Sequence, residues 1–214
     1  NPRLFGSAQP ANGVLSITDE IRLNFNETIA EGYLTDNNFQ VTGIRNGSQT
    51  DHSVSVRLDG KNDCLTTEFE RNWANKDLTI EMWVLADQRQ NAVFFSQGNV
   101  NEALELGITA DNHLKVRVGT TEIASQDAVP YEQGTWAHVA FVFDKTGYVS
   151  AYYNFVEYIS HMETGAYNGE GMYVFGASIN GGGNFAGKMH NARIWDKVLT
   201  SGRIQTNSMN LLSG

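Results

Sequence analysis

Cysteine and proline are both scarce in this chain. One cysteine, Cys64, and three prolines occur in 214 residues. A single thiol excludes an internal disulfide and a zinc site built from cysteines, because each needs at least two thiol groups. Cys64 follows Asp63 just ahead of an expected strand, and a lone thiol in that setting is usually a small core residue. We therefore expect Cys64 to be structural.

Charge is also scarce, and one sign dominates. Charged residues make up 18% of the chain, with 15 Lys and Arg against 24 Asp and Glu, so the net charge is −9. This balance argues against nucleic acid and anionic membrane surfaces as partners, because both are bound through Lys and Arg. Neutral glycans, basic partners and divalent cations stay open as ligand classes.

Long apolar runs are missing as well. No stretch of about 18 apolar residues occurs, so no membrane insertion is expected, and no signal peptide is recognisable. The chain starts with Asn-Pro-Arg instead of Met. We expect it to be a piece of a longer protein whose targeting signals lie outside it.

The residues that are abundant point to β-structure. The 21 glycines suit many turns between short strands. Apolar residues alternate with Glu, Gly, Lys or Arg in 104–108 and 114–118, and the large residues Val139, Phe141 and Phe143 are expected to share one face of a third strand. One apolar face per strand is what two packed antiparallel sheets require. A parallel α/β fold is excluded because no amphipathic helices separate the strands.

Four segments in chain order carry a resemblance to a known family. They are 78–84 (LTIEMWV), 136–144 (WAHVAFVFD), 151–154 (AYYN) and 184–195 (NFAGKMHNARIW). With the earlier DGKND at 59–63, they resemble the laminin G-like branch of the concanavalin A-like β-sandwiches over about 54–205. The resemblance implies an all-β, antiparallel two-sheet jelly roll. Six residues should be largely buried: Trp83, Leu106, Val116, Phe141, Phe143 and Ile194.

Residues 1–50 differ from the rest. The alternating stretch 21–29 (IRLNFNETI) and the later 38–43 (NFQVTG) resemble the first half of bacterial Ig-like domains. The polar, turn-rich residues 44–53 read as a linker. We therefore divide the chain into a partial Ig-like segment with its linker at 1–50 and a laminin G-like domain at 51–214.

Catalytic motifs are missing from the sequence. Glycanases of this fold use Glu-x-Asp-x-x-Glu to place two carboxylates about 5 to 5.5 Å apart, and no segment has that pattern. Glu102 and Glu105 are three residues apart, so on a strand they would face opposite sides. Gly-x-Ser-x-Gly is also absent. His138 is expected to be a structural histidine, so we predict that the chain is not an enzyme.

The resemblance implies no required cofactor, but it suggests a possible site for a structural calcium ion. Relatives hold calcium between the DG..D turn and the Asp of the closing strand. The chain supplies Asp59, Gly60 and Asp63 at the turn, whereas His190 stands where the family has Asp. Calcium prefers carboxylate and carbonyl oxygens, so this replacement removes one ligand charge.

Binding residues are expected in the loops at the rim of the sandwich, where rigid folds present function. Tyr152 or Tyr167 would supply a ring that stacks on a sugar. The amides of the Asn-rich turns would supply hydrogen bonds: Asn101, Asn112, Asn180 and Asn184.

The resemblance implies a non-catalytic binding or adhesion module of a large secreted or cell-surface bacterial protein, with a glycan as ligand. One alternative is an architectural spacer or a domain that binds an extracellular protein. A glycoside hydrolase is a further alternative, which the missing carboxylate motif opposes.

Overall fold

We describe the chain from a computed structural model. The structure describes residues 44–45, 48–49, 55–70, 72–73, 75–99, 101–162, 167 and 169–208. Internal contacts divide the chain into two units, residues 1–44 and 45–214. In the first 50 residues only β1 (Ile44–Arg45) and β2 (Ser48–Gln49) are described, and they pair with each other. The rest of the predicted Ig-like segment lies outside the described residues.

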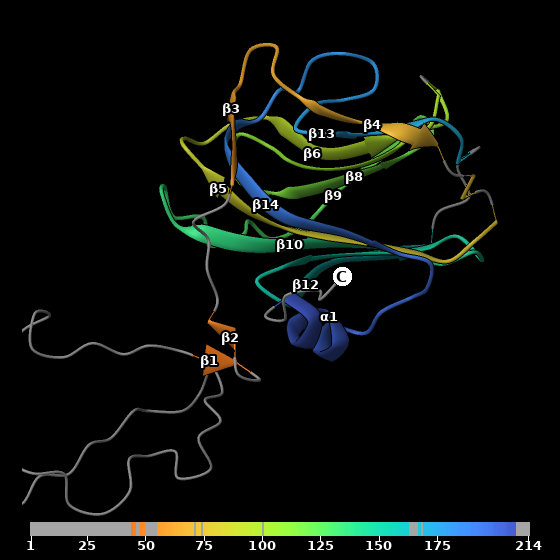
Figure 1. Cartoon of the computed structure of the whole chain (residues 1–214). Coiled ribbons are helices and arrows are strands. Elements are labelled where there is room, and N and C mark those ends of the chain that lie inside the picture. Colours follow the sequence, from red (N-terminus) through yellow and green to blue (C-terminus); the bar gives the residue numbers. More distant parts are fainter. Residues whose placement is uncertain are drawn as a thin grey trace, which may run out of the picture. The chain divides into compact units, whose positions relative to one another are not determined.

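Two antiparallel sheets of six strands each form the second unit (Figure 1). The first sheet has the order β12-β11-β10-β5-β14-β3 and the second sheet the order β4-β13-β6-β7-β8-β9. The first sheet contains β3 (Val56–Asp59), β5 (Leu78–Ala86), β10 (Trp136–Phe143), β11 (Tyr148–Tyr153), β12 (Val156–Met162) and β14 (Ala186–Trp195). The second sheet contains β4 (Leu65–Glu70), β6 (Ala92–Gln97), β7 (Leu104–Ile108), β8 (Leu114–Val118), β9 (Thr121–Ala124) and β13 (Met172–Phe175). The predicted all-β sandwich is confirmed.

The main core lies between the two sheets. Leu106 and Val116 from the second sheet and Phe141 and Phe143 from the first are buried there, as predicted. Ile194 packs against this core and is partly buried. Trp83 is also only partly buried, since its neighbours Met82 and Val84 occupy the inner face of β5. Side chains alternate along a strand, so Trp83 points to the outer face of the first sheet.

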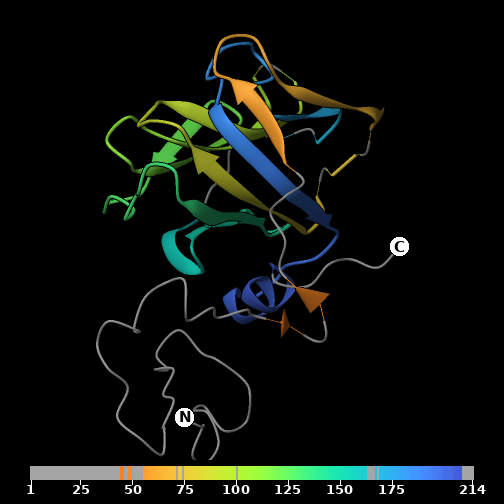
Figure 2. The ribbon, with the colours of Figure 1, turned by 60° about the vertical axis from the view of Figure 1, so that its left-hand side comes forward.

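A short helix covers part of that outer face. Helix α1 (Ser201–Ser208) follows β14 and lies on the side of the first sheet away from the second sheet (Figures 1 and 2). It forms a second, smaller apolar cluster with strands β10 and β11. The cluster contains Ala140, Val142, Tyr152, Leu199 and Ile204.

The outward residues of β5 hold this C-terminal segment in place. The Thr79 hydroxyl donates to the carbonyl of Lys197 at 2.7 Å and accepts from the amide of Leu199 at 3.1 Å. The Trp83 indole donates to the carbonyl of Ser208 at 3.2 Å. The TIE.W motif thus faces outward at alternate positions and fixes the segment that follows the last strand.

The glycine of the closing F.G motif, Gly187, is required because neighbouring atoms lie too close to its Cα for a side chain to fit. A Cβ placed on Gly187 would lie 2.2 Å from the carbonyl oxygen of Leu85 and 2.7 Å from the ring of Phe185. Gly187 pairs with Ala86 and Leu58 in the centre of the first sheet, so the backbone cannot move aside easily. Only a residue without a side chain fits there.

Candidate binding site

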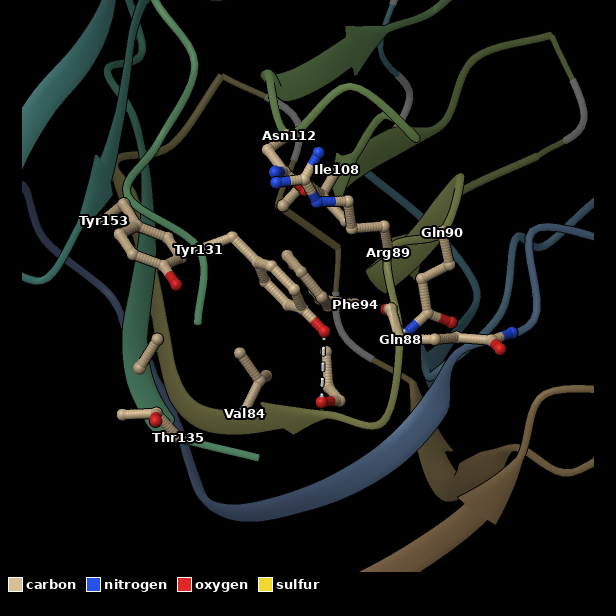
Figure 3. Close-up of a pocket in the computed structure, with 12 residues that line it drawn as sticks. Val84, Gln88, Arg89, Gln90, Phe94, Ile108, Asn112, Tyr131, Thr135 and Tyr153 are labelled. Atoms are coloured by element: carbon tan, nitrogen blue, oxygen red, sulfur yellow. Dashed lines mark hydrogen bonds between the residues drawn. The ribbon is translucent and has the colours of Figure 1, made fainter. Parts of the chain in front are cut away.

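A pocket opens between the two sheets at the end of the sandwich that carries the β7–β8 turn. Its volume is about 330 Å³ when the open solvent at its mouth is included. Its lining residues come from β5, the β5–β6 loop, β6, β7, the β7–β8 turn and the segment from Tyr131 through β10 to β11 (Figure 3). They are Val84, Ala86, Gln88, Arg89, Gln90, Phe94, Ile108, Asn112, Tyr131, Thr135, Ala137 and Tyr153.

Asn112 offers this pocket an amide without a partner. The residue is 6% exposed, and its Oδ1 atom is buried with no hydrogen bond among the described residues. Its backbone amide donates to Thr109 at 3.0 Å and its carbonyl accepts from Val129 at 2.8 Å, so the turn is fixed. Asn112 has a φ of 65°, a left-handed conformation that Asn tolerates better than most residues. A buried unpaired amide is costly, so this group is available to a ligand.

Two tyrosines border the pocket (Figure 3). The Tyr131 hydroxyl donates to the carbonyl of Ala86 at 3.3 Å, which holds the partly buried ring across the pocket. Burial raises the pKa of Tyr131. It also raises the pKa of Tyr153, to about 12, with smaller contributions from Tyr131, Tyr158 and Glu132. Both phenols are therefore neutral donors at ordinary pH.

The floor of the pocket is apolar, and its wall is rigid. Phe94 and Ile108 belong to the main core. The Gln90 side chain forms two hydrogen bonds with the backbone of Ala186, at 2.7 and 2.8 Å, so its amide is already used. An apolar base with few convergent polar groups is the usual design of a small-ligand site.

The predicted asparagines do not gather at one rim. Asn112 lines the pocket, but Asn101 lies in the β6–β7 turn, at the other end of β7. Successive turns of an antiparallel meander alternate between the two ends of the sheet, so these two residues cannot share a site. Asn180 and Asn184 lie in the β13–β14 loop, where the Asn184 amide donates to the carbonyl of Lys61. Of the four, only Asn112 lines the pocket.

The two tyrosines predicted to stack on a sugar are packing residues. Tyr152 is 9% exposed in the cluster under α1, and its hydroxyl donates to Glu157 at 3.0 Å. Tyr167 packs edge-on against Phe143, and its hydroxyl donates to Gln97 at 2.6 Å. Burial raises the pKa of Tyr167 strongly. Neither ring lines the pocket, whereas Tyr131, which was not predicted as a site residue, does.

The residues predicted for calcium form a turn closed by backbone hydrogen bonds. Asp59 accepts from the amide of Lys61 at 2.8 Å, and its own amide donates to Asp63 at 3.1 Å. The Lys61 amide, foremost, lowers the pKa of the exposed Asp59 carboxyl. Gly60 has a φ of 75°, as the turn requires. No group of three or more His, Cys, Asp or Glu suited to a metal occurs among the described residues.

His190 does not lie beside that turn. Asp59 pairs with Ala186, whereas His190 lies four positions further along β14 and pairs with Trp83. Four residues of strand span about 13 Å. His190 packs edge-on against Trp136, with ring centres 5.5 Å apart. The position at which the family has Asp therefore lies away from the Asp59 turn in this chain, and the calcium site stays a prediction.

Three sequence motifs converge on a buried polar cluster on the outer face of the first sheet. Glu81 is fully buried, and its Oε1 accepts from the Trp195 indole at 2.8 Å. His138 Nε2 lies 3.4 Å from Glu81 Oε2, and Arg193 Nη1 lies 3.8 Å from Oε1. Burial lowers the pKa of His138 and outweighs the opposite effect of Glu81, so the imidazole is neutral. Phe155 stacks on it at 4.9 Å. The His138 side chain is buried in this cluster, but its Nδ1 atom has no hydrogen-bond partner among the described residues.

Two other residues singled out in the sequence are Glu105, considered as a catalytic acid, and Cys64, expected in the core. Glu105 faces the outer side of the second sheet, where Arg117 binds it through two nitrogens at 2.6 and 2.9 Å, so it is engaged in an ion pair. Cys64 is exposed, immediately before β4, so its expected place in the core is wrong. The polar residues around it mark a turn.

The fold and its pocket define a class: a jelly-roll sandwich with a concave, mainly apolar site at one end. The profile of the concanavalin A-like lectin/glucanases superfamily matches residues 59–205. The chain belongs to this superfamily, and the predicted resemblance is confirmed. No curated protein matches the chain in sequence.

Solved structures with the same fold include binding and lectin-like domains. A heptameric SAP-like pentraxin of Limulus polyphemus has a TM-score of 0.57 at 19% identity, covering 71% of this chain and 80% of that chain. Domain 4 of AbnA, an extracellular arabinanase of Geobacillus stearothermophilus, was solved in complex with arabinotriose; it has a TM-score of 0.55 at 18% identity, and the match covers 71% of this chain and 75% of that chain. A putative carbohydrate binding protein of Bacteroides ovatus has a TM-score of 0.53 at 16% identity, and the match covers 77% of this chain and 49% of that chain. Some other similar chains come from sialidases. At these identities the likeness shows the fold alone.

Within the described residues, no helix has the length and apolar character needed to cross a membrane.

Proposed function

We propose that the chain is a non-catalytic carbohydrate-binding module of a secreted or surface-attached bacterial protein. The observation that supports this most is the end pocket, in which the partly buried Tyr131 ring and the unpaired Asn112 amide oxygen line an apolar cavity. Tyrosine rings stack on the C–H faces of sugars, and amides bond their hydroxyl groups. Arabinotriose in the Geobacillus domain and the description of the Bacteroides protein agree with a glycan ligand.

A non-catalytic role fits the pocket because it lacks a pair of acids. Among the twelve lining residues none is Asp or Glu, whereas glycoside hydrolysis by retaining or inverting enzymes uses two carboxyl groups. Binding through rings and amides needs no such pair.

A glycan array probed with the whole chain tests the proposal, with titration of each bound glycan by calorimetry. Tyr131→Ala should weaken binding about three- to tenfold, the scale of one aromatic contact. Asn112→Gly should also weaken binding, because it removes the amide yet keeps a residue that tolerates the left-handed backbone. Tyr148→Ala is the matched control, since Tyr148 is 40% exposed on β11 and does not line the pocket.

The array result also separates the competing functions. A blank array would contradict a glycan-binding module and favour an architectural or protein-binding domain. Binding that survives both pocket variants would leave the module in place but show that the sugar lies elsewhere. Release of reducing sugar from a β-glucan would contradict the non-catalytic assignment.

A further inference from the structure

We propose that the end pocket selects a sugar unit that carries a carboxylate, with Arg89 as its counter-charge. This inference rests on the proposed carbohydrate-binding function and names the class of sugar. It is argued from the charge of the pocket and from the charged groups around it.

Arg89 is the single charged residue among the twelve that line the pocket. The whole chain carries a net charge of −9. An acidic protein repels an anionic ligand at long range, so a ligand with a carboxylate needs a local cation to bind. Figure 3 shows the Arg89 side chain extended along the border of the pocket toward Asn112.

The carboxylate nearest to Arg89 in sequence is engaged elsewhere. Asp87 pairs with Arg57 from β3 at 2.6 Å. Arg89 is exposed, and the described residues give it no ion-pair partner. Two acidic groups oppose an anion here: the charge of the exposed Glu132 acts on Tyr153, and the charge of Asp87 acts on Tyr131. The guanidinium thus keeps donors for a ligand at the mouth.

Guanidinium chemistry favours a carboxylate over a hydroxyl group. Its planar fork donates two parallel hydrogen bonds to the two oxygens of one carboxylate, and such charge-assisted bonds are stronger than neutral ones. Arg89 would hold the acid group while the Tyr131 ring packs on the sugar and the Asn112 amide bonds a hydroxyl or acetamido group. A single sugar unit would then contact all three groups.

The experiment compares each acid with its own uncharged form. The probes are the methyl glycosides of glucuronic, galacturonic and N-acetylneuraminic acid, each beside its methyl ester, titrated into the whole chain and followed by amide shifts in NMR spectra. For the preferred sugar, the acid should bind about tenfold more tightly than the ester, the scale of a charge-assisted bond pair. Raising the salt concentration should reduce that ratio.

Variants of Arg89 test the residue itself. Arg89→Ala should remove the preference for the acid but leave binding of the ester unchanged, and Arg89→Lys should keep part of it, because an ammonium lacks the planar fork. Arg203→Ala, on the exposed side of α1, should keep the full preference.

The outcomes separate this inference from the function on which it rests. If acid and ester bind equally, or if Arg89→Ala weakens both alike, the carboxylate assignment is wrong while carbohydrate binding stands. If neither the acids nor the esters bind and the glycan array is also blank, the carbohydrate-binding function itself is overturned, together with the inference.

Discussion

Glu81 is the residue whose loss should damage the fold most clearly. Its carboxylate is fully buried beside the Arg193 guanidinium, whose side chain is 2% exposed. Glu81→Gln keeps the shape and an oxygen for the Trp195 indole but removes the charge that faces Arg193. Breaking a buried ion pair by changing one partner costs about 3 to 5 kcal/mol, because the other charge stays buried without compensation.

Urea unfolding, monitored by tryptophan fluorescence, measures how much Glu81→Gln lowers the free energy of unfolding. For a domain of this size, the expected cost corresponds to a fall in melting temperature of about 6 to 20 °C. Glu122→Gln is the control, because Glu122 lies on edge strand β9, 54% exposed and 3.9 Å from Lys115, and should change stability by less than about 0.5 kcal/mol. A cost below about 1 kcal/mol for Glu81→Gln would show that Glu81 is not the counter-charge of Arg193.

Three further predictions concern stability. Gly187→Ala should lower the free energy of unfolding in urea by about 1 to 3 kcal/mol, because the added Cβ would lie 2.2 Å from the Leu85 carbonyl oxygen. Gly202→Ala is the control and should not lower it, because nothing lies within 4 Å of its added Cβ. Equal effects of the two changes would contradict the close approach at Gly187. The pKa of His138 is lowered in the folded state, so as the pH drops the unfolded chain takes up this proton at a higher pH than the folded chain. The free energy of unfolding should therefore fall as the pH drops below about 6.5. His138→Asn should make the free energy of unfolding less dependent on pH, and an unchanged dependence would refute a neutral buried imidazole. Calcium should raise the melting temperature by no more than about 1 °C, since Asp59 Oδ1 and Asp63 Oδ2 already accept backbone hydrogen bonds. A larger rise that is lost in Asp63→Asn would show that calcium does bind there.

The sequence pattern predicts the central strands better than the edge strands. β7 and β8 can be recognised because one face of each enters the core, which forces apolar and polar residues to alternate. No strand was predicted at β9 or β12, and each is the last strand at an edge of its sheet. Edge strands are exposed, as Val156 and Met162 of β12 show, so no alternating pattern is imposed on them.

The binding site could be predicted only in part. Asn112 was found because Asp-Asn marks a turn that needs a left-handed residue. Arg89, Tyr131 and Tyr153 come from three other segments, and only the packing of the two sheets brings them to one cavity. The predicted order of strands could have shown that Asn101 and Asn112 do not share a site. They lie in successive turns of an antiparallel meander, and such turns lie at opposite ends of the sheet.

The position of β14 sets the order in which the domain can be completed during synthesis. β14 lies between β5 and β3 in the first sheet, although among the described strands it comes last in the chain. Before β14 has left the ribosome, β5 and β3 cannot be joined, and each keeps an open row of backbone donors and acceptors that can pair with another nascent chain. Folding of the sandwich therefore stays vulnerable to aggregation until β14 emerges, and any translational pause before β14 prolongs that interval.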